Sequence, residues 1–124
     1  MQREMDTGAG VFRTKEAMEK LIEQLGGLRE RFGRIRIEDT SRTFNTEVTA
    51  AMELDFMLEL AQTMAVSALA REESRGAHAR RDFPERDDKK YLKHTLAFRR
   101  EGARPRLEYR DVRITNFQPQ ARTY

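Results

Sequence analysis

The chain has 124 residues with 24 Lys or Arg, 21 Asp or Glu and a net charge of +3, so its length fits one domain of ~100–150 residues. The absence of cysteine excludes disulfides, cysteine-ligated zinc, iron–sulfur ligation and thiol catalysis within this sequence. No charge-free apolar run approaches the ~18 residues of a membrane span, and no basic-led apolar segment near Met1 indicates a secretory signal, so we expect a soluble fragment without direct membrane insertion.

The first predicted element is a short helix over residues 1–7. This segment is polar and helix-compatible, with Met1 and Met5 one turn apart, and Gly8 and Gly10 are expected to end it. A helix of fewer than two turns is marginal alone. The segment therefore resembles the end of a longer helix, and the chain a piece of a larger protein.

Residues 14–32 show the pattern of an amphipathic helix, with Thr14 as its N-cap and Gly33 as its stop. Gly26 and Gly27 interrupt the pattern at a cost of ~1 kcal/mol each relative to Ala, so either the helix bends there or another backbone packs close. One apolar stripe follows the helical period and comprises Met18, Leu21, Ile22, Leu25, Leu28 and Phe32.

A polar connector over 34–45 leads to the strongest predicted helix, residues 46–73, which Asn45 or Thr46 can cap. Its apolar side chains cover more than one face, which predicts burial on most sides. The spacing of Ala61, Ala65 and Ala68 allows close approach of a neighbouring helix. Two interpretations stay open: a central bundle helix, or a helix with one face docked on a further domain outside this chain.

Residues 74–90 form a dense polar segment that is too charged to be buried without partners. Residues 91–98 and 106–114 then alternate apolar with polar side chains around a Gly/Pro turn, which predicts a β-hairpin. In the first of these strands Leu92, His94, Leu96 and Phe98 form one set. The tail after residue 114 has no periodicity.

Few residues of this sequence fit a pattern for catalysis, nucleotide binding or metal binding. Gly8-Ala9-Gly10 lacks the preceding strand and third glycine of a dinucleotide motif, and His78 and His94 do not occur in a recognisable metal-binding spacing. Residues 71–113 hold 14 Lys or Arg and 9 Asp or Glu, but the signs are interleaved. Interleaved charges fit an ion-pair network at a protein interface better than a nucleic-acid footprint, so we expect no nucleic acid, no metal and no catalytic residue here.

The stretch from Glu73 to Leu96 closely resembles the C-terminal domain of succinate dehydrogenase and fumarate reductase flavoprotein subunits. The matching elements are ESRGAH (73–78), Asp82-Phe83-Pro84, RDD (86–88), Tyr91 where the family commonly has Trp, and KHT (93–95). GVFRT (10–14), SRTFNTE (41–47), RLEYRDVRIT (106–115) and Tyr124 also look like the family. L-aspartate oxidase shares the Ser-Arg-Gly-x-His element but not the RDD and KHT continuation, which favours the respiratory enzyme.

This resemblance implies a mainly α fold: a three-helix, spectrin-repeat-like bundle with a truncated first helix, followed by a small β-hairpin region. We expect a helical bundle over 1–73 and a polar docking segment, hairpin and tail over 74–124. The parent subunit would use FAD to interconvert succinate and fumarate and pass electrons to an iron–sulfur subunit, at the cytoplasmic face of a membrane. None of the family's catalytic or cofactor-binding elements matches these 124 residues, so the isolated chain is expected to be inactive and to bind no FAD.

The polar segment is the part of the resemblance that suggests contact with other parts of such an enzyme. We expect it to dock on the FAD-binding domain of the same subunit or on the iron–sulfur subunit. The expected docking residues are Arg75, His78, Asp82, Arg86, Asp87 and Asp88. The alternatives are the C-terminal domain of L-aspartate oxidase, a stand-alone basic module that binds nucleic acid, and an adaptor that uses helix 46–70 as its partner surface.

Overall fold

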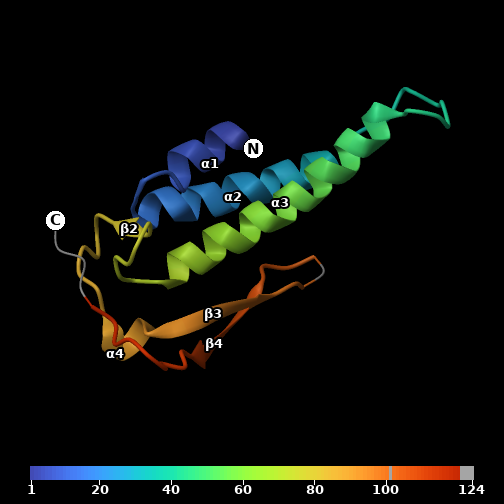
Figure 1. Ribbon diagram of the computed structural model, residues 1–124. Coiled ribbons are helices and arrows are strands. Elements are labelled where there is room, and N and C mark those ends of the chain that lie inside the picture. Colours follow the sequence, from blue (N-terminus) through green and yellow to red (C-terminus); the bar gives the residue numbers. More distant parts are fainter. Residues whose placement is uncertain (101, 121–124) are drawn as a thin grey trace.

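The computed structural model describes residues 1–100 and 102–120, and its fold is mainly α, as predicted. Three helices form a bundle in which α1 lies across α2, α2 and α3 lie side by side, and the β3–β4 hairpin runs along α3 (Figure 1). The elements are α1 (Gln2–Gly8), β1 (Phe12–Arg13), α2 (Lys15–Phe32), α3 (Thr46–Ala70), β2 (Ala79–Arg80), α4 (Asp88–Tyr91), β3 (Lys93–Phe98) and β4 (Arg106–Asp111).

The two long helices begin where their capping residues predict. The Thr14 hydroxyl accepts a hydrogen bond from the Ala17 amide at 3.2 Å, and the Asn45 side chain accepts one from the Val48 amide at 3.0 Å. Each cap satisfies an amide that the first helical turn leaves without a partner. The predicted starts of α2 and α3 are therefore confirmed.

The core lies between α2 and α3. Leu21, Ile22 and Leu25 of α2 pack against three buried residues of α3, namely Leu58, Ala61 and Ala65. The small alanine side chains allow the helices to approach closely, as their spacing predicted. The stripe predicted for α2 is also confirmed, because Met18 is buried and Leu28 and Phe32 pack against the edge of this core.

Gly8 has a different role from the one expected. It is the last residue of α1 rather than a residue beyond the helix end. A Cβ at this position would lie 2.6 Å from the Leu21 Cβ, so glycine is needed because α1 crosses α2 too closely for a side chain. The helix does end at Gly8, as predicted, but close packing against α2 rather than a left-handed backbone conformation explains the glycine.

The prediction that α3 is buried on most sides is wrong for this chain. Leu58 is 4% exposed, but Leu60, two residues further, is 62% exposed, and Phe56 and Met64 are exposed to a similar extent. Because one turn is 3.6 residues, neighbouring positions point to different sides of the helix and only one side reaches α2. The opposite apolar side stays largely exposed.

Gly26 and Gly27 lie within α2, which runs through them without interruption. A Cβ at either position would meet no atom within 4 Å. Within the described chain, close packing of another backbone therefore does not explain this glycine pair.

The hairpin is confirmed, with β3 and β4 antiparallel and Leu96 opposite Glu108. Both strands are shorter than the predicted 91–98 and 106–114, because Tyr91 belongs to α4 and β4 ends at Asp111. The burial alternates along β3, but Leu96 and Phe98 belong to the more exposed face, whereas Thr95 and Ala97 are more buried. The Arg106 guanidinium lies over the Phe98 ring, 4.6 Å from its centre, and covers part of that face. The described tail, residues 115–120, has no helix or strand, and Tyr124 lies outside the described residues.

Candidate functional site

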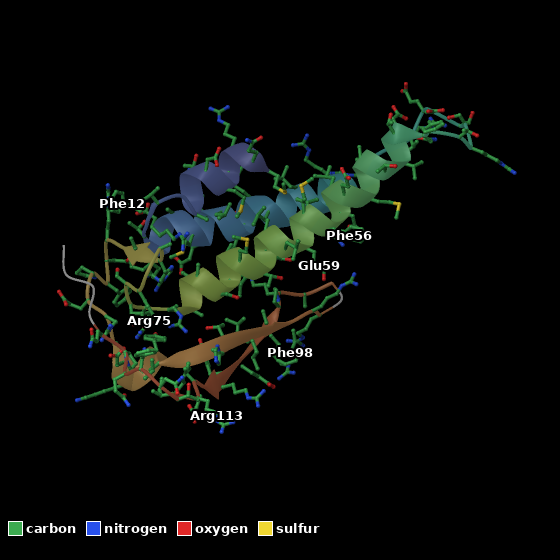
Figure 2. All side chains as sticks on the ribbon, viewed as in Figure 1. Phe12, Phe56, Glu59, Arg75, Phe98 and Arg113 are labelled. Atoms are coloured by element: carbon green, nitrogen blue, oxygen red, sulfur yellow. The ribbon has the colours of Figure 1, made fainter. Side chains whose placement is uncertain are left out.

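The predicted docking residues lie in one folded unit, here called the charged segment, residues 71–91. It begins where α3 ends, continues through β2 and ends with the short helix α4, at the same end of the bundle as β1 (Figure 1). Figure 2 shows Arg75 and Phe12 at this end of the molecule. The charged side chains of the segment are bonded mainly to each other and to the ends of the helices.

The Glu73 carboxylate is the centre of the network and is fully buried. It accepts hydrogen bonds from Arg71, from Arg75 at 2.9 and 3.0 Å and from the Asp87 amide at 2.9 Å. Burial raises the pKa of this carboxyl, but the hydrogen bonds from Arg75, Asp87 and Arg71 outweigh that effect and lower its pKa below the usual value. Glu73 therefore remains ionised although no water reaches it.

Arg75 extends the network outward to the predicted docking residues Arg86 and Asp88. Its Nη2 donates to Asp88 Oδ1 at 2.6 Å, and Arg86 Nη2 donates to Asp88 Oδ2 at 2.7 Å. Asp87 caps α4 by accepting from the Lys89 and Lys90 amides, both at 3.0 Å. Asp88 therefore joins two arginines, whereas Asp87 caps the start of α4.

Arg80 connects the segment to the C-terminal end of α3. Its side chain is almost fully buried, and its Nη1 donates to the Leu69 and Arg71 carbonyls at 3.2 and 3.1 Å. The last turn of a helix leaves such carbonyls without partners and carries partial negative charge, so a guanidinium is a suitable cap.

Asp82 connects the other side of Arg80 to the start of α2. Its two carboxylate oxygens accept from Arg80 Nε and Nη2, both at 2.7 Å, and Oδ2 also accepts from the Lys15 amide at 2.8 Å. The hydrogen bonds from Arg80 hold the pKa of the Asp82 carboxyl far below its usual range. Arg80 and Asp82 thus link the end of α3 to the beginning of α2.

His78 is half-buried and lies between Arg13 of β1 and Arg71, the residue after α3. Its Nδ1 is 2.8 Å from Arg13 Nη1, and its Nε2 is 3.1 Å from the Arg71 carbonyl oxygen. Because arginine can only donate, Nδ1 is the acceptor and Nε2 carries the proton, which defines a neutral imidazole. Burial, together with the nearby charges of Arg13, Arg80 and Arg71, lowers the pKa of His78 below 6.5.

Backbone contacts hold this arrangement together. β1 and β2 form a short parallel pair in which Phe12 is opposite Ala79, and the Arg81 amide donates to the Arg13 carbonyl at 2.9 Å. Ser74 Oγ accepts from the Arg80 amide at 2.8 Å and donates to the Phe83 carbonyl at 2.9 Å. This pairing brings residues 65 positions apart, such as Arg13 and His78, into contact.

All six predicted docking residues therefore lie in this one segment, and each makes a hydrogen bond within the chain. They keep some accessible surface, with side-chain exposures of 27% for Arg75 and Arg86 and 37% for Asp88. Four further charged contributors to the network are not among the six predicted docking residues: Arg13, Arg71, Glu73 and Arg80. The alternation of charge at positions 71, 73 and 75 is a signal that could have indicated Arg71 and Glu73, whereas Arg13 is distant in sequence and only folding brings it next to His78.

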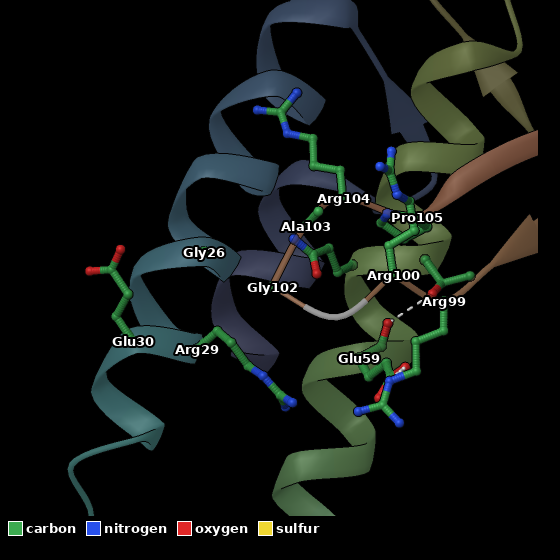
Figure 3. Close-up of a pocket in the computed structure, with 12 residues that line it drawn as sticks. Gly26, Arg29, Glu30, Glu59, Arg99, Arg100, Gly102, Ala103, Arg104 and Pro105 are labelled. Atoms are coloured by element: carbon green, nitrogen blue, oxygen red, sulfur yellow. Dashed lines mark hydrogen bonds and ion pairs between the residues drawn. The ribbon is translucent and has the colours of Figure 1, made fainter.

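A second feature is a hollow of about 510 Å³ between the helices and the tip of the hairpin (Figure 3). Two of its arginines are paired with carboxylates: Arg99 Nε is 2.8 Å from Glu59 Oε1, and Arg29 is bonded to Asp55. The lining residues include Gly26, Arg29, Glu59, Arg99, Arg100 and Arg104. These ion pairs reduce the positive charge of the hollow.

Within residues 1–100 and 102–120, no group of three His, Asp or Glu side chains is placed to hold a metal ion. In the same residues no helix is long and apolar enough to cross a membrane.

Comparisons with known proteins relate the whole chain to one family. The family model described as "Fumarate reductase flavoprotein C-term" matches residues 1–124. The chain is 52% identical over 122 residues to the fumarate reductase flavoprotein subunit of Escherichia coli strain K12 and 49% identical over 120 residues to that of Haemophilus influenzae. Each alignment covers 97% of this chain but only 20% of the relative, so the chain spans about a fifth of their length.

A solved structure gives the same result. The FrdA chain of an E. coli quinol fumarate reductase variant superposes with a TM-score of 0.91 at 50% sequence identity. The superposition covers 96% of this chain and 21% of that one. The bundle and hairpin described above therefore have a close counterpart within a much longer polypeptide.

Proposed function

Because this chain belongs to the family of fumarate reductase flavoprotein C-terminal domains, we propose that it is the C-terminal helical domain of a succinate dehydrogenase or fumarate reductase flavoprotein subunit. The observation on which this rests is the coverage: the whole chain matches, but it spans a fifth of each relative. The domain's role is structural. It stabilises and docks within the subunit, and the oxidoreductase chemistry belongs to the rest of the parent protein.

In this proposal the parent subunit binds FAD, interconverts succinate and fumarate, and transfers electrons to an iron–sulfur subunit of a complex at the cytoplasmic face of a membrane. This chain itself contributes no cofactor ligand. Four arginines of the charged segment, Arg71, Arg75, Arg80 and Arg86, are bonded to carboxylates or carbonyls of the same chain, and these bonds support a scaffolding role for them rather than substrate binding.

The charged segment is proposed as one docking surface of the domain, through Arg75, His78, Asp82, Arg86, Asp87 and Asp88. Its network fixes these side chains before any partner arrives, so little conformational entropy is lost on contact. The partner is the FAD-binding domain of the same subunit or the iron–sulfur subunit. The outer edge of the network, where Asp88 and Arg86 are partly exposed, would make that contact.

The proposal of an inactive structural domain is tested with the purified 124-residue chain. We expect no flavin absorption band in the visible spectrum and no dye-coupled oxidation of succinate, with a full-length E. coli subunit as positive control. A stoichiometric flavin spectrum or turnover of succinate by the chain alone would overturn the proposed division of roles.

The docking role of the charged segment is tested in a full-length subunit that carries this sequence as its C-terminal part. Arg86→Glu should leave the helical content of the isolated chain unchanged, because Arg86 is on the rim of the network, but should reduce assembly of the full-length subunit with its iron–sulfur partner. Lys89→Glu is the matched control, since Lys89 is an exposed cation of the same segment outside the proposed surface. Equal assembly of both variants and the parent sequence would contradict docking of this segment on the iron–sulfur subunit.

A further inference from the structure

An exposed apolar surface runs along α3. We call it the α3 stripe and define it as Met52, Phe56, Met57, Leu60 and Met64. These side chains are between 43% and 62% exposed. Met52, Phe56, Leu60 and Met64 follow one another at four-residue intervals, which places them on one side of a helix. Contiguous apolar patches of this kind mark interaction surfaces more often than isolated exposed residues do.

The stripe is separate from the surfaces that the chain uses itself. α3 contacts α2 through Leu58, Ala61 and Ala65, on another side of the helix. Between Phe56 and Met64 the only charged residue is Glu59, and its carboxylate is bonded to Arg99 of the hairpin at 2.8 Å. Figure 2 labels Phe56 and Glu59 on α3 and Phe98 on the hairpin.

This composition makes the part of the stripe from Phe56 to Met64 suited to permanent burial. Covering it removes large apolar side chains from water, which is favourable in proportion to the buried area. No unpaired charge has to be desolvated between Phe56 and Met64, so the usual cost of burying polar groups is small there. The charged segment differs in this respect, because its groups are already bonded within the chain.

We propose that the α3 stripe is the apolar contact surface of this domain toward the remainder of its own flavoprotein subunit. The inference rests on the proposed function and specifies which surface of the domain contacts the rest of the subunit. The occupant follows from the coverage: in relatives such as the E. coli subunit, about four-fifths of the polypeptide lies outside the part that this chain matches. An apolar face of that larger part would cover the stripe, while the charged segment sets the orientation of the contact.

The experiment uses methionine oxidation, since the stripe contains Met52, Met57 and Met64 and the core contains the fully buried Met18. Hydrogen peroxide oxidises exposed methionine faster than buried methionine. Oxidation at each methionine is followed by mass spectrometry in two proteins: the 124-residue chain, and a full-length E. coli subunit in which this sequence replaces the matched segment.

In the isolated chain we expect fast oxidation of Met52, Met57 and Met64 and slow oxidation of Met18. In the full-length subunit, oxidation of the three stripe methionines should become at least about tenfold slower, because exposure controls the rate. Unchanged rates at these methionines in a folded, flavin-containing subunit would overturn the inference and leave the proposed function intact. A full-length subunit that neither folds nor retains flavin would overturn the proposed function, and this inference with it.

A second measurement tests the alternative that another copy of this chain covers the stripe. Sedimentation of the isolated chain at increasing concentration should show a monomer, with stripe methionines equally reactive throughout. Association accompanied by protection of Met57 and Met64 would assign the stripe to a homodimer and overturn the proposed occupant.

A variant pair provides a test independent of oxidation. Leu60→Gln combined with Met64→Gln should leave the unfolding of the isolated chain nearly unchanged and make the full-length subunit more sensitive to proteolysis by at least about tenfold, since an unpaired amide would be buried at the contact. Phe44→Gln is the control, because Phe44 is exposed on the α2–α3 connector outside the stripe. Equal proteolysis of all three full-length proteins would overturn the inference.

Discussion

At the scale of single residues, the charged segment shows how ionised side chains become buried in a domain of modest size. Glu73 and Arg80 are 0% and 2% exposed, and each has several hydrogen-bond partners within the chain. Among the described residues that are not exposed, no buried side-chain nitrogen or oxygen lacks a partner. Since an unpaired buried charge is far more costly than a paired one, the network is stable only as a complete set.

His78 makes this network sensitive to pH. Its pKa is lowered in the folded chain, so folding releases protons from the imidazole in the pH range between its folded and unfolded pKa values. The stabilisation by His78 is therefore complete above pH 6.5, the ordinary pKa, and decreases as the pH falls below that value. Urea unfolding should give a lower free energy of unfolding at pH 5.5 than at pH 7.5.

His78→Gln is the control for this prediction, because glutamine does not titrate and His94 is present in both proteins. The variant should show a smaller change in the free energy of unfolding between the two pH values. Identical changes in both proteins would show that the effect comes from other groups. Asp82, whose pKa is also lowered, contributes stability that is lost at still lower pH, below its ordinary value of 3.8.

At the scale of elements, the glycines of the first two helices have opposite environments. Gly8 allows α1 to cross α2, because a Cβ there would overlap the Leu21 side chain. Gly27 is exposed within α2, and a Cβ there would meet nothing within 4 Å. The same substitution should therefore have opposite effects at the two sites.

Gly8→Ala should lower the free energy of unfolding by ~1–3 kcal/mol, because the added methyl forces the two helices apart. Gly27→Ala should raise it by ~0.5–1 kcal/mol, because alanine loses less backbone entropy in a helix. Thermal or urea unfolding followed by circular dichroism measures both. A destabilising Gly27→Ala would indicate a contact at Gly27 that the structure does not contain.

The two sides of α3 allow a similar comparison. Leu58→Ala should cost ~2–5 kcal/mol, because the side chain is 4% exposed and its removal leaves a cavity against α2. Leu60→Ala should cost less than ~1 kcal/mol in the isolated chain, because Leu60 is largely exposed. Equal losses in urea unfolding would show that the helix is rotated relative to this structure.

At the scale of the whole molecule, the charged segment joins elements that are distant in sequence. Arg80 bonds the end of α3 and Asp82, and Asp82 bonds the start of α2. Arg71 donates to the Tyr91 and Lys93 carbonyls at 2.8 and 2.7 Å and so holds α4 and the start of the hairpin against the bundle. One network therefore fixes the bundle and hairpin relative to each other.

Arg80→Met should destabilise the chain by ~3–5 kcal/mol, the typical result of removing one partner of a buried ion pair. Arg81→Met is the matched control. The Arg81 side chain is exposed and lies over the Phe12 ring, 4.8 Å from its centre, so its loss should cost less than ~1 kcal/mol. Urea unfolding at pH 7.5 measures both. Equal effects would mean that the network does not depend on burial of Arg80.

The sequence by itself determined the three helices of the bundle and the hairpin, but not the short elements β1, β2 and α4. The three helices and the hairpin depend on local patterns: Thr14 and Asn45 cap their own first turns, and the alternation over 93–98 specifies a strand. Tertiary structure alone decided which side of α3 is buried, because apolar residues occupy both sides and only contact with α2 distinguishes them. It also decided the roles of Gly8, Arg13 and Glu73, because close helix crossing and burial of charge depend on partners that become neighbours only when the chain folds.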